Sequence, residues 1–446
     1  MKNNVLIICI IGMSLVSCHD ESVTVSNNSL GEKVINLTPK ELLSISFEES
    51  QELSEPEIVE LLNEFRKNEG FVKLSSDAIA IKRKHEIEHS ISNKNFKSFI
   101  YEVDIETADD KYTAIVSGDK RFPFVLSYFH NGNQRSNQTC NMLSVEYSQK
   151  VMSEHIRNLE MIKDSLRDNT VKKIATNLSV REDKLNINEA IKHVKIKNST
   201  RSSIILNPPT DAIAGNGPFI NVSWDEGMPY NRLMEQSCSD NWLWDYRYPI
   251  SSIVVTTAEV LSYFRPSMTI DGIKIDWDYL CKNEEIHEES DYFGGYEQDP
   301  LDKRNMIATL MKYIGTECQV NYSCSSSSVN FNNVIAFLNK YNIKINNKQN
   351  LDVTNLKYSI DDFEPVIMYG KTSSGGGHWW VVDGYRAQTA TRGTFFPGYN
   401  IYMHANMGMG KSYTGYYLVG TNGSLTFDSS FAHFNTDLVM YTNIRE

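Results

Sequence analysis

One histidine lies at the start of an apolar strand, where a titratable side chain is not expected. The segment Gly375–Tyr385, GGGHWWVVDGY, places His378 between a run of glycines and an apolar strand. A histidine assists nucleophilic chemistry when a hydroxyl or thiol reaches one ring nitrogen and an orienting group holds the other. The segment IYMHANMGMGKSYTGYY contains two possible orienting groups, His404 and Asn406, on one face of a predicted strand. Asn406 is the better candidate because its side-chain oxygen accepts from the ring N–H without adding a charge. We therefore predict that His378 is a general base and acid, and that Asn406 orients it.

The partner nucleophile is expected at the start of a buried helix, where the terminal N–H groups and the helix dipole favour an anion. The segment YPISSIVVTTAEVLSYFRP fits, because an apolar run from Ile253 to Phe264 follows two serines and Pro266 ends it. Ser251 or Ser252 is predicted to cap this helix. Ser252 is therefore either the nucleophile position or only the cap of a core helix.

Cys238 is a second candidate nucleophile, since EQSCSDNWLW contains a thiol with an aromatic residue downstream. The short stretch between Cys238 and Pro249 shows no clean helical face, so a disulfide partner or a loop thiol is the stronger interpretation.

Five cysteines lie beyond the N-terminal segment: Cys140, Cys238, Cys281, Cys318 and Cys324. An odd count leaves at least one thiol unpaired, and Cys318 with Cys324 is one conceivable bridge. No pair has metal-ligand spacing with histidines beside it. We expect neither a metal nor a cofactor.

The first residues, MKNNVLIICIIGMSLVSC, combine a basic residue with an apolar run too short to cross a bilayer. Residues 1–17 are predicted to be a lipoprotein signal peptide, with Cys18 as the acylated first residue. A plain signal peptide cut nearby is the alternative. Residues 18–33 are predicted to be an acidic tether, so we expect an exported, membrane-anchored lipoprotein at the cell surface or outer membrane.

Composition limits the remaining possibilities. A chain of 446 residues exceeds what one hydrophobic core usually covers, and a hydrophobic content of 41% is that of globular domains. The net charge of −12 argues against nucleic acid as a partner.

The chain divides by composition into two domains. Residues 34–197 read as a small α+β unit, with a helix after Ser54 and two strands around a Gly-Asp turn in KYTAIVSGDKRFPFVLSYFHNGN. Residues 198–217 are rich in Ser, Asn, Pro and Gly and are predicted to be a linker. All six tryptophans follow it, so we place a second domain at residues 218–446.

The order of nucleophile helix, histidine strand and asparagine strand resembles the papain-like peptidases, and more closely the streptopain family, which includes interpain. The family has a W-x-Q-x-x-P-Y-N opening, a G-C-V-A-T-A-x-A-Q helix, a G-H-x-W-V-x-D-G-Y strand and an H-x-N-W-G-W-G-G…G-Y-Y strand. This sequence has WDEGMPYN from Trp224, SSIVVTTAE from Ser251, GHWWVVDGY from Gly377 and HANMGMGKSYTGYY from His404.

The resemblance implies an α+β fold class. Residues 218–446 would form a papain-like two-lobed catalytic domain, with a helical lobe and an antiparallel β lobe. Residues 34–197 would be an α+β inhibitory prodomain that fills the cleft, and residues 198–217 would be the processing region. The implied partners are a peptide or protein substrate, the chain's own prodomain, and a membrane through Cys18.

Among the positions that depart from the family pattern, three have distinct chemical roles in the family. Its nucleophilic cysteine falls at Ser252, its oxyanion-donor glutamine at Glu226, and the tryptophan beside the asparagine at Met407. A serine hydroxyl stays neutral and must lose its proton during attack. An ionised Glu226 would oppose the negative charge of the tetrahedral intermediate, unless its pocket keeps the carboxyl protonated.

Two functions therefore remain. The sequence favours a catalytically impaired peptidase homologue that acts in peptide binding or regulation. The alternative is an active endopeptidase in which Ser252, or another nucleophile, works with His378 and Asn406 after the prodomain has been processed. A third reading, a serine introduced to disable a cysteine peptidase, fits less well because Glu226 and Met407 also differ.

Overall fold

The protein was analysed as a computed structural model. It describes residues 35–46, 52–67, 78–91, 94–107, 110–131, 137–191, 194–196, 212–239, 245–290, 297–389, 399–419, 427–428 and 432–446. The predicted signal peptide, Cys18 and the tether lie outside these ranges. Within them, no helix combines the length and the apolar character needed to cross a membrane.

Residues 35–196, here called the N-terminal domain, are built on an antiparallel meander of four strands. These are β2 (Ala78–Ile91), β3 (Lys94–Glu106), β4 (Lys111–Ser117) and β5 (Val125–His130). The two strands predicted on either side of Gly118 and Asp119 are present, but the turn itself lies at Lys120 and Arg121. Helix α2 (Glu55–Lys67) starts after Ser54, whose backbone N–H donates to the Glu57 carboxylate at 2.7 Å, as in a capping box.

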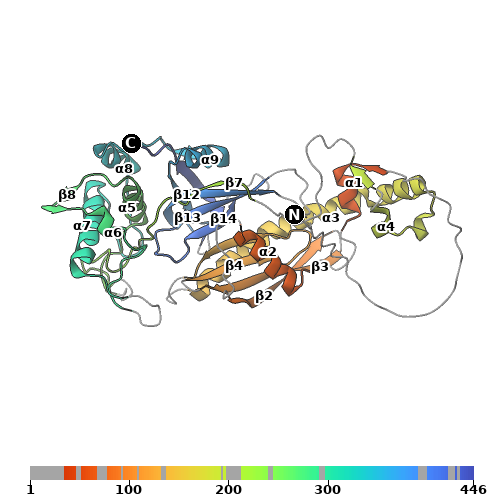
Figure 1. Ribbon diagram of the computed structural model, residues 1–446, viewed down its shortest axis with the longest axis horizontal. Helices are drawn as coiled ribbons and strands as arrows, with labels where there is room; N and C mark the ends of the chain where they lie inside the picture. The colour runs from red at the N-terminus through yellow and green to blue at the C-terminus, as the bar shows by residue number, and fades with distance from the viewer. Residues whose placement is uncertain are drawn as a thin grey trace, which may run out of the picture.

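The long helix α3 (Asn137–Leu178) follows the meander. Its C-terminal part lies with α1 (Pro39–Ser44) and α4 (Ile187–Ile191) at one end of the molecule (Figure 1). A parallel pair of short strands, β1 (Ile35–Leu37) and β6 (Val194–Ile196), and the 3-10 helix η1 (Glu182–Lys184) complete this end.

Residues 212–446, here called the C-terminal domain, supply the remaining elements. Its helices are α5 (Ser252–Phe264), α6 (Trp277–Leu280), α7 (Leu301–Glu317), α8 (Phe331–Lys340) and α9 (Val353–Asp361). Its strands are β7 (Ala212–Asn216), β8 (Thr269–Ile270), β9 (Ile273–Lys274), β10 (Gln349–Asn350), β11 (Val366–Lys371), β12 (Gly377–Thr389), β13 (Tyr399–Asn406), β14 (Gly415–Val419), β15 (Phe427–Asp428), β16 (His433–Phe434) and β17 (Thr436–Tyr441).

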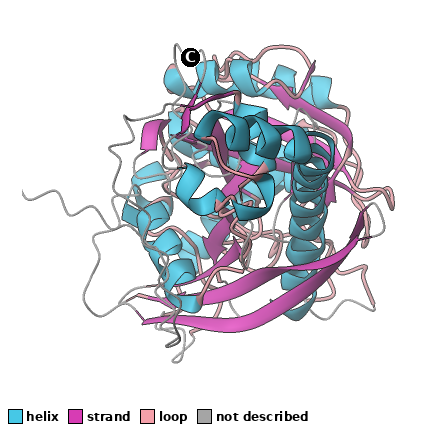
Figure 2. Ribbon diagram, turned by 90° about the vertical axis from the view of Figure 1, so that its right-hand side faces the viewer, coloured by secondary structure: helices cyan, strands magenta, loops and turns pink. Residues whose placement is uncertain are grey.

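A single eleven-stranded sheet runs through both domains. Its order is β10-β17-β11-β12-β13-β14-β5-β4-β3-β2, and β7 pairs with the later part of β12. The pairs along it are antiparallel, and helices pack around the strands (Figure 2). The expected mixed α+β fold with a large antiparallel sheet is therefore present, and the N-terminal region is itself α+β.

Two apolar cores lie on opposite faces of the β11–β12 region. Helices α5, α7 and α8 cover one face, and the other joins the N-terminal domain. Trp379, partly buried, packs against the first core, whereas Trp380, fully buried, belongs to the second. Neighbouring residues of a strand point to opposite faces, so these two adjacent tryptophans pack into different cores.

The predicted linker at residues 198–217 ends differently from expectation. Its last residues form β7, in which Asn216 pairs with Tyr385 and Ala214 with Ala387. Small residues are typical of linkers, but they also fit a strand that is stabilised mainly by backbone hydrogen bonds. The segment that can act as a linker is therefore shorter than composition suggests.

Candidate functional site

Ser252 is the first residue of α5 and is partly exposed. Ser251 precedes it at the N-cap position, in an extended conformation and without a side-chain capping bond. The ten residues from Ile253 to Ser262 are buried, which fixes the helix in the first core. The backbone N–H of Trp379 donates to the Ser252 hydroxyl at 3.4 Å. The helix start and the histidine strand thus meet, as predicted.

His378 lies near the start of β12, paired with Gly370 of β11. Its Nε2 is 2.7 Å from the carbonyl oxygen of Met407. A carbonyl only accepts, so Nε2 carries a proton and Nδ1 keeps a lone pair while the ring is neutral. Burial lowers the pKa of His378 to about 4, outweighing the Met407 hydrogen bond, which favours the charged ring. At neutral pH the ring is therefore an uncharged base.

Asn406 ends β13 and is buried beside the histidine's partner. Its amide donates to the carbonyl of Val222 at 2.7 Å, and its oxygen accepts from the Gly408 N–H at 3.2 Å and the Thr414 hydroxyl at 3.3 Å. These bonds hold the turn that presents the Met407 carbonyl. Sequence reasoning assigned the contact with the ring to the Asn406 side chain, whereas the structure supplies a main-chain carbonyl one residue later.

Met407 itself is fully buried. The residue after it, Gly408, has a positive φ of 66°, a conformation in which glycine carries no steric cost. The Met407 side chain thus lies in the core at the position where the resemblance places a tryptophan.

Glu226 lies in the irregular segment that precedes α5. Its carbonyl accepts from the Ile250 N–H at 2.8 Å, two residues before Ser252. Burial, followed by the charge of Asp225, raises the pKa of Glu226 to about 8. The carboxyl is therefore protonated at neutral pH and has an O–H to donate, as a glutamine amide has an N–H.

Further acidic groups lie behind Glu226. The Lys411 backbone N–H donates to the Glu285 carboxylate at 2.8 Å, and burial and neighbouring acids raise the pKa of Glu285 to about 7 despite that bond. The Lys411 ammonium lies 2.8 Å from Glu284 and 3.3 Å from Asp110 of the N-terminal domain. No group of His, Cys, Asp and Glu residues suited to a metal ion was found among the described residues.

His404, the alternative orienting residue, is engaged elsewhere. Its Nδ1 is 2.6 Å from the carboxylate of Asp383, a fully buried residue of β12. The second oxygen of Asp383 accepts from the Ile220 N–H at 2.8 Å. This pair joins β12, β13 and the start of the C-terminal domain.

Sequence reasoning missed Glu259. Its carboxyl is fully buried on α5 and accepts from the Trp224 N–H at 3.0 Å. Burial raises the pKa of Glu259 well above its usual value, although the Trp224 and Asn406 hydrogen bonds act in the opposite direction. It therefore links the nucleophile helix to the segment of Glu226 and to Asn406. The available signal was a lone acidic residue inside the apolar run TTAEVL.

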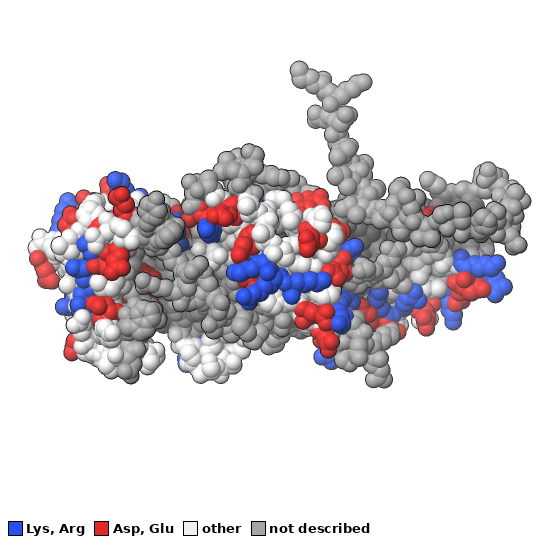
Figure 3. Space-filling model, turned by 90° about the horizontal axis from the view of Figure 1, so that it is seen from below, with Lys and Arg blue, Asp and Glu red and all other residues white. Residues whose placement is uncertain are grey.

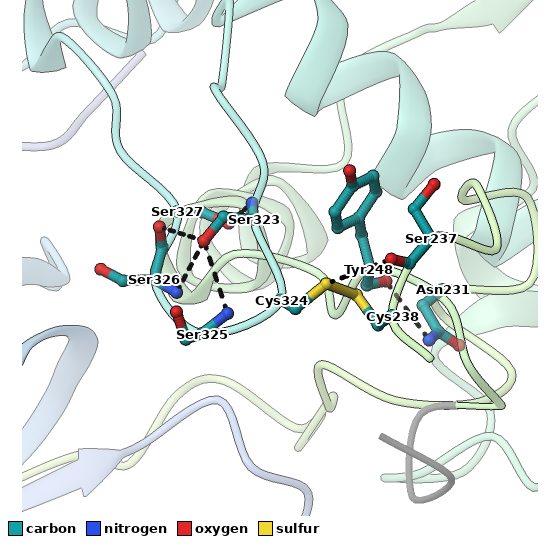
Figure 4. The surroundings of a disulfide bond; sticks show 9 residues. All are labelled: Asn231, Ser237, Cys238, Tyr248, Ser323, Cys324, Ser325, Ser326 and Ser327. Carbon is teal, nitrogen blue, oxygen red and sulfur yellow. Dashed lines mark hydrogen bonds between the residues drawn. A yellow bond between two sulfur atoms is a disulfide. The ribbon is translucent and has the colours of Figure 1, made fainter. Parts of the chain in front are cut away.

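The disulfide differs from the bridge considered in the sequence. Cys238 is bonded to Cys324 (Figure 4). Cys318 is a buried free thiol. The stronger interpretation of Cys238, a disulfide partner, is confirmed. In this form Cys238 has no thiol for nucleophilic attack. The bond fastens the loop before α5 to the loop after α7.

Comparison with known proteins identifies the region that contains this site. Residues 224–417 match the Peptidase C10 family, so the chain carries a domain of that family. The match includes Glu226, Ser252, His378 and Asn406. No curated protein matches the chain.

Proposed function

We propose that the Peptidase C10 family domain at residues 224–417 binds extended segments of peptides and proteins but hydrolyses them poorly. The family implies protein or peptide substrates. In this proposal the helices α5 to α8 form one lobe of a papain-like domain and the sheet forms the other. Ser252, at the nucleophile position, would face His378 between them.

The serine at the first position of α5, where the family has its nucleophile, carries the proposal. A cysteine site works through a thiolate beside a charged imidazole, but Ser252 has a hydroxyl and the ring is neutral. The hydroxyl proton must pass to His378 during attack, and a base with a pKa of about 4 is a weak proton acceptor. General acid–base catalysis is worth ~10²–10⁴-fold when the base is matched to the working pH. Much of that factor is lost here.

Glu226 favours a second candidate, a serine-dependent endopeptidase. A protonated Glu226 would donate an O–H where negative charge develops, so the replacement of glutamine by glutamate would keep an oxyanion donor. The backbone N–H of Ser252 would be the second donor. Asn406 would act through the turn that holds the Met407 carbonyl against His378.

The remaining features of the proposal concern location and control. The N-terminal domain would act as an inhibitory prodomain, and Cys18 would carry the lipid that anchors an exported protein at the cell surface or outer membrane. The acidic tether of residues 18–33 would keep the domains clear of the bilayer.

The test compares three proteins: the wild type, Ser252→Ala and Ser252→Cys, each prepared from residue 18 onward and each cut or uncut between residues 198 and 211. Fluorescein-labelled casein measures hydrolysis, and biolayer interferometry measures casein binding. We expect slow or undetectable hydrolysis by the wild type, binding by Ser252→Ala, and a large gain of hydrolysis in Ser252→Cys.

Wild-type hydrolysis equal to that of Ser252→Cys, and lost in Ser252→Ala, would replace the proposal with the serine-dependent peptidase. If Ser252→Ala does not bind casein and Ser252→Cys does not hydrolyse it, both candidates are rejected.

A further inference from the structure

The two domains meet along a strand pair. Residues Gly415, Tyr416 and Tyr417 of β14 pair with Phe129, Tyr128 and Ser127 of β5, respectively. The ladder continues beyond β14, because the His130 N–H donates to the Thr414 carbonyl at 3.1 Å. A Cβ at Gly415 would lie 2.3 Å from the Tyr128 carbonyl oxygen. The backbones approach so closely that position 415 requires a glycine.

One apolar core is shared by the two domains. From the N-terminal side it contains Phe124, Phe129 and Met152, and from the C-terminal side Met403 and Tyr417. Each is at most 3% exposed. Phe129 and Tyr417 stack with their ring centroids 6.2 Å apart. Separation of the domains would place these side chains in water.

Tyr402 of β13 is inserted into the N-terminal domain. Its ring packs edge-on against Phe65 of α2 with a centroid distance of 5.1 Å. Tyr402 thus belongs to a third apolar core, formed mainly by residues of the N-terminal domain. Its hydroxyl donates to the Val125 carbonyl at 2.9 Å, with the tyrosine 1% exposed. A buried hydrogen bond inside an apolar contact fixes the orientation of one domain on the other.

Ion pairs on the outer surface join strands of one domain, whereas an ion pair at the interface joins the two domains. Acidic and basic side chains are intermixed over the middle of the face seen in Figure 3. Strands β2 and β3 carry cross-strand ion pairs, such as Lys82 with Asp104 at 3.5 Å and Lys111 of β4 with Glu106 at 3.1 Å. At the interface, by contrast, Lys411 bridges Asp110 to Glu284 beside the apolar core.

From these contacts we infer that the N-terminal domain is a lasting non-covalent partner of the C-terminal domain. When the chain is cut between residues 198 and 211, the two fragments stay together as one complex. A departing N-terminal domain would leave unpaired edges on β5 and β14 and an exposed apolar surface, which soluble proteins avoid. The inference requires no hydrolysis by Ser252, but it bears on the proposed function, because a cut alone then leaves the N-terminal domain in place during the hydrolysis and binding tests.

The test uses the chain from residue 18 onward, with Ser252→Ala to exclude self-cleavage and a site for a sequence-specific protease inserted between residues 198 and 211. The cut protein is applied to a gel-filtration column at micromolar concentration. We expect one peak that contains both fragments. Two separate peaks of folded fragments would overturn the inference.

Two variants test the interface itself. Phe129→Asp places a charge in the shared core, and we expect the cut fragments to separate. Asp437→Ala, which removes an exposed ion pair with Lys371 away from the interface, is the control and should leave one peak. Co-elution of the Phe129→Asp fragments would show that another surface holds them and would contradict the inference.

Hydrogen exchange keeps the test decisive if Phe129→Asp fails to fold. In the otherwise unaltered cut protein, the amides of Tyr416 and Tyr417 should remain as protected as in the intact chain. A loss of their protection by tenfold or more after cutting would mean that the β5–β14 ladder opens, and the inference would fail.

Discussion

Replacement of Glu226 by glutamine should stabilise the protein increasingly as the pH rises. Burial raises the pKa of Glu226 to about 8 from a usual value of 4.5. The folded state therefore binds a proton that the unfolded state releases above pH 4.5, and stability is lost as the pH rises from 4.5 towards 8. Each pH unit in this window costs ~1.4 kcal/mol. The cost is ~3 kcal/mol at pH 7 and below ~1 kcal/mol at pH 5. Glutamine does not titrate, so the Glu226→Gln variant does not undergo this loss of stability.

The assay compares the thermal unfolding of wild type and Glu226→Gln at pH 5, 6, 7 and 8. Glu235→Gln, an exposed glutamate of the same segment, is a control for the loss of one negative charge. We expect the advantage of Glu226→Gln over the wild type to grow by ~2–3 kcal/mol between pH 5 and pH 7. A pH-independent difference, or one matched by Glu235→Gln, would refute the assignment of a protonated carboxyl and remove the basis for Glu226 as an oxyanion donor.

Three further predictions concern single groups. Cys324→Ser removes the disulfide bond to Cys238, 86 residues away, and should lower the free energy of unfolding by ~2–5 kcal/mol in thermal unfolding. Cys318→Ser is the control, because it removes a free thiol and breaks no cross-link. Tyr402→Phe removes the bond to the Val125 carbonyl and should cost ~1–3 kcal/mol in the same measurement; no change would mean that water replaces the hydroxyl. The His378 ring should titrate near pH 4 by NMR, and a midpoint near 6.5 would contradict the weak-base argument.

Local patterns in the sequence were sufficient for the elements that carry the site. The apolar run that ends at Pro266 identified α5, and the apolar segment after His378 identified β12. These features depend on neighbouring residues, whose periodicity directly encodes which side is buried.

Contacts made by the main chain could not be found in this way. The Met407 carbonyl, which holds the histidine ring, would look the same with almost any side chain at position 407. The pairing of β7 with β12 is likewise a matter of backbone hydrogen bonds. Reasoning from side chains therefore assigned the ring contact to Asn406 instead of the Met407 carbonyl. It also extended the linker over the residues that form β7.

Long-range pairing was the other source of error. Cys318 is nearer to Cys324 in the sequence, but its side chain is buried in the helical core. Cys238 reaches Cys324 because two loops converge, and connectivity of this kind does not follow from spacing.

The order in which the strands are made gives the continuous sheet a further consequence. β5 belongs to the first half of the chain, whereas its neighbour β14 is made close to the C-terminus. During synthesis the N-terminal meander therefore has an open edge on β5 until almost the entire chain has emerged. Contacts between such distant segments form slowly. A chain truncated before Gly415 should accordingly aggregate through that edge, although every residue of its N-terminal domain is present.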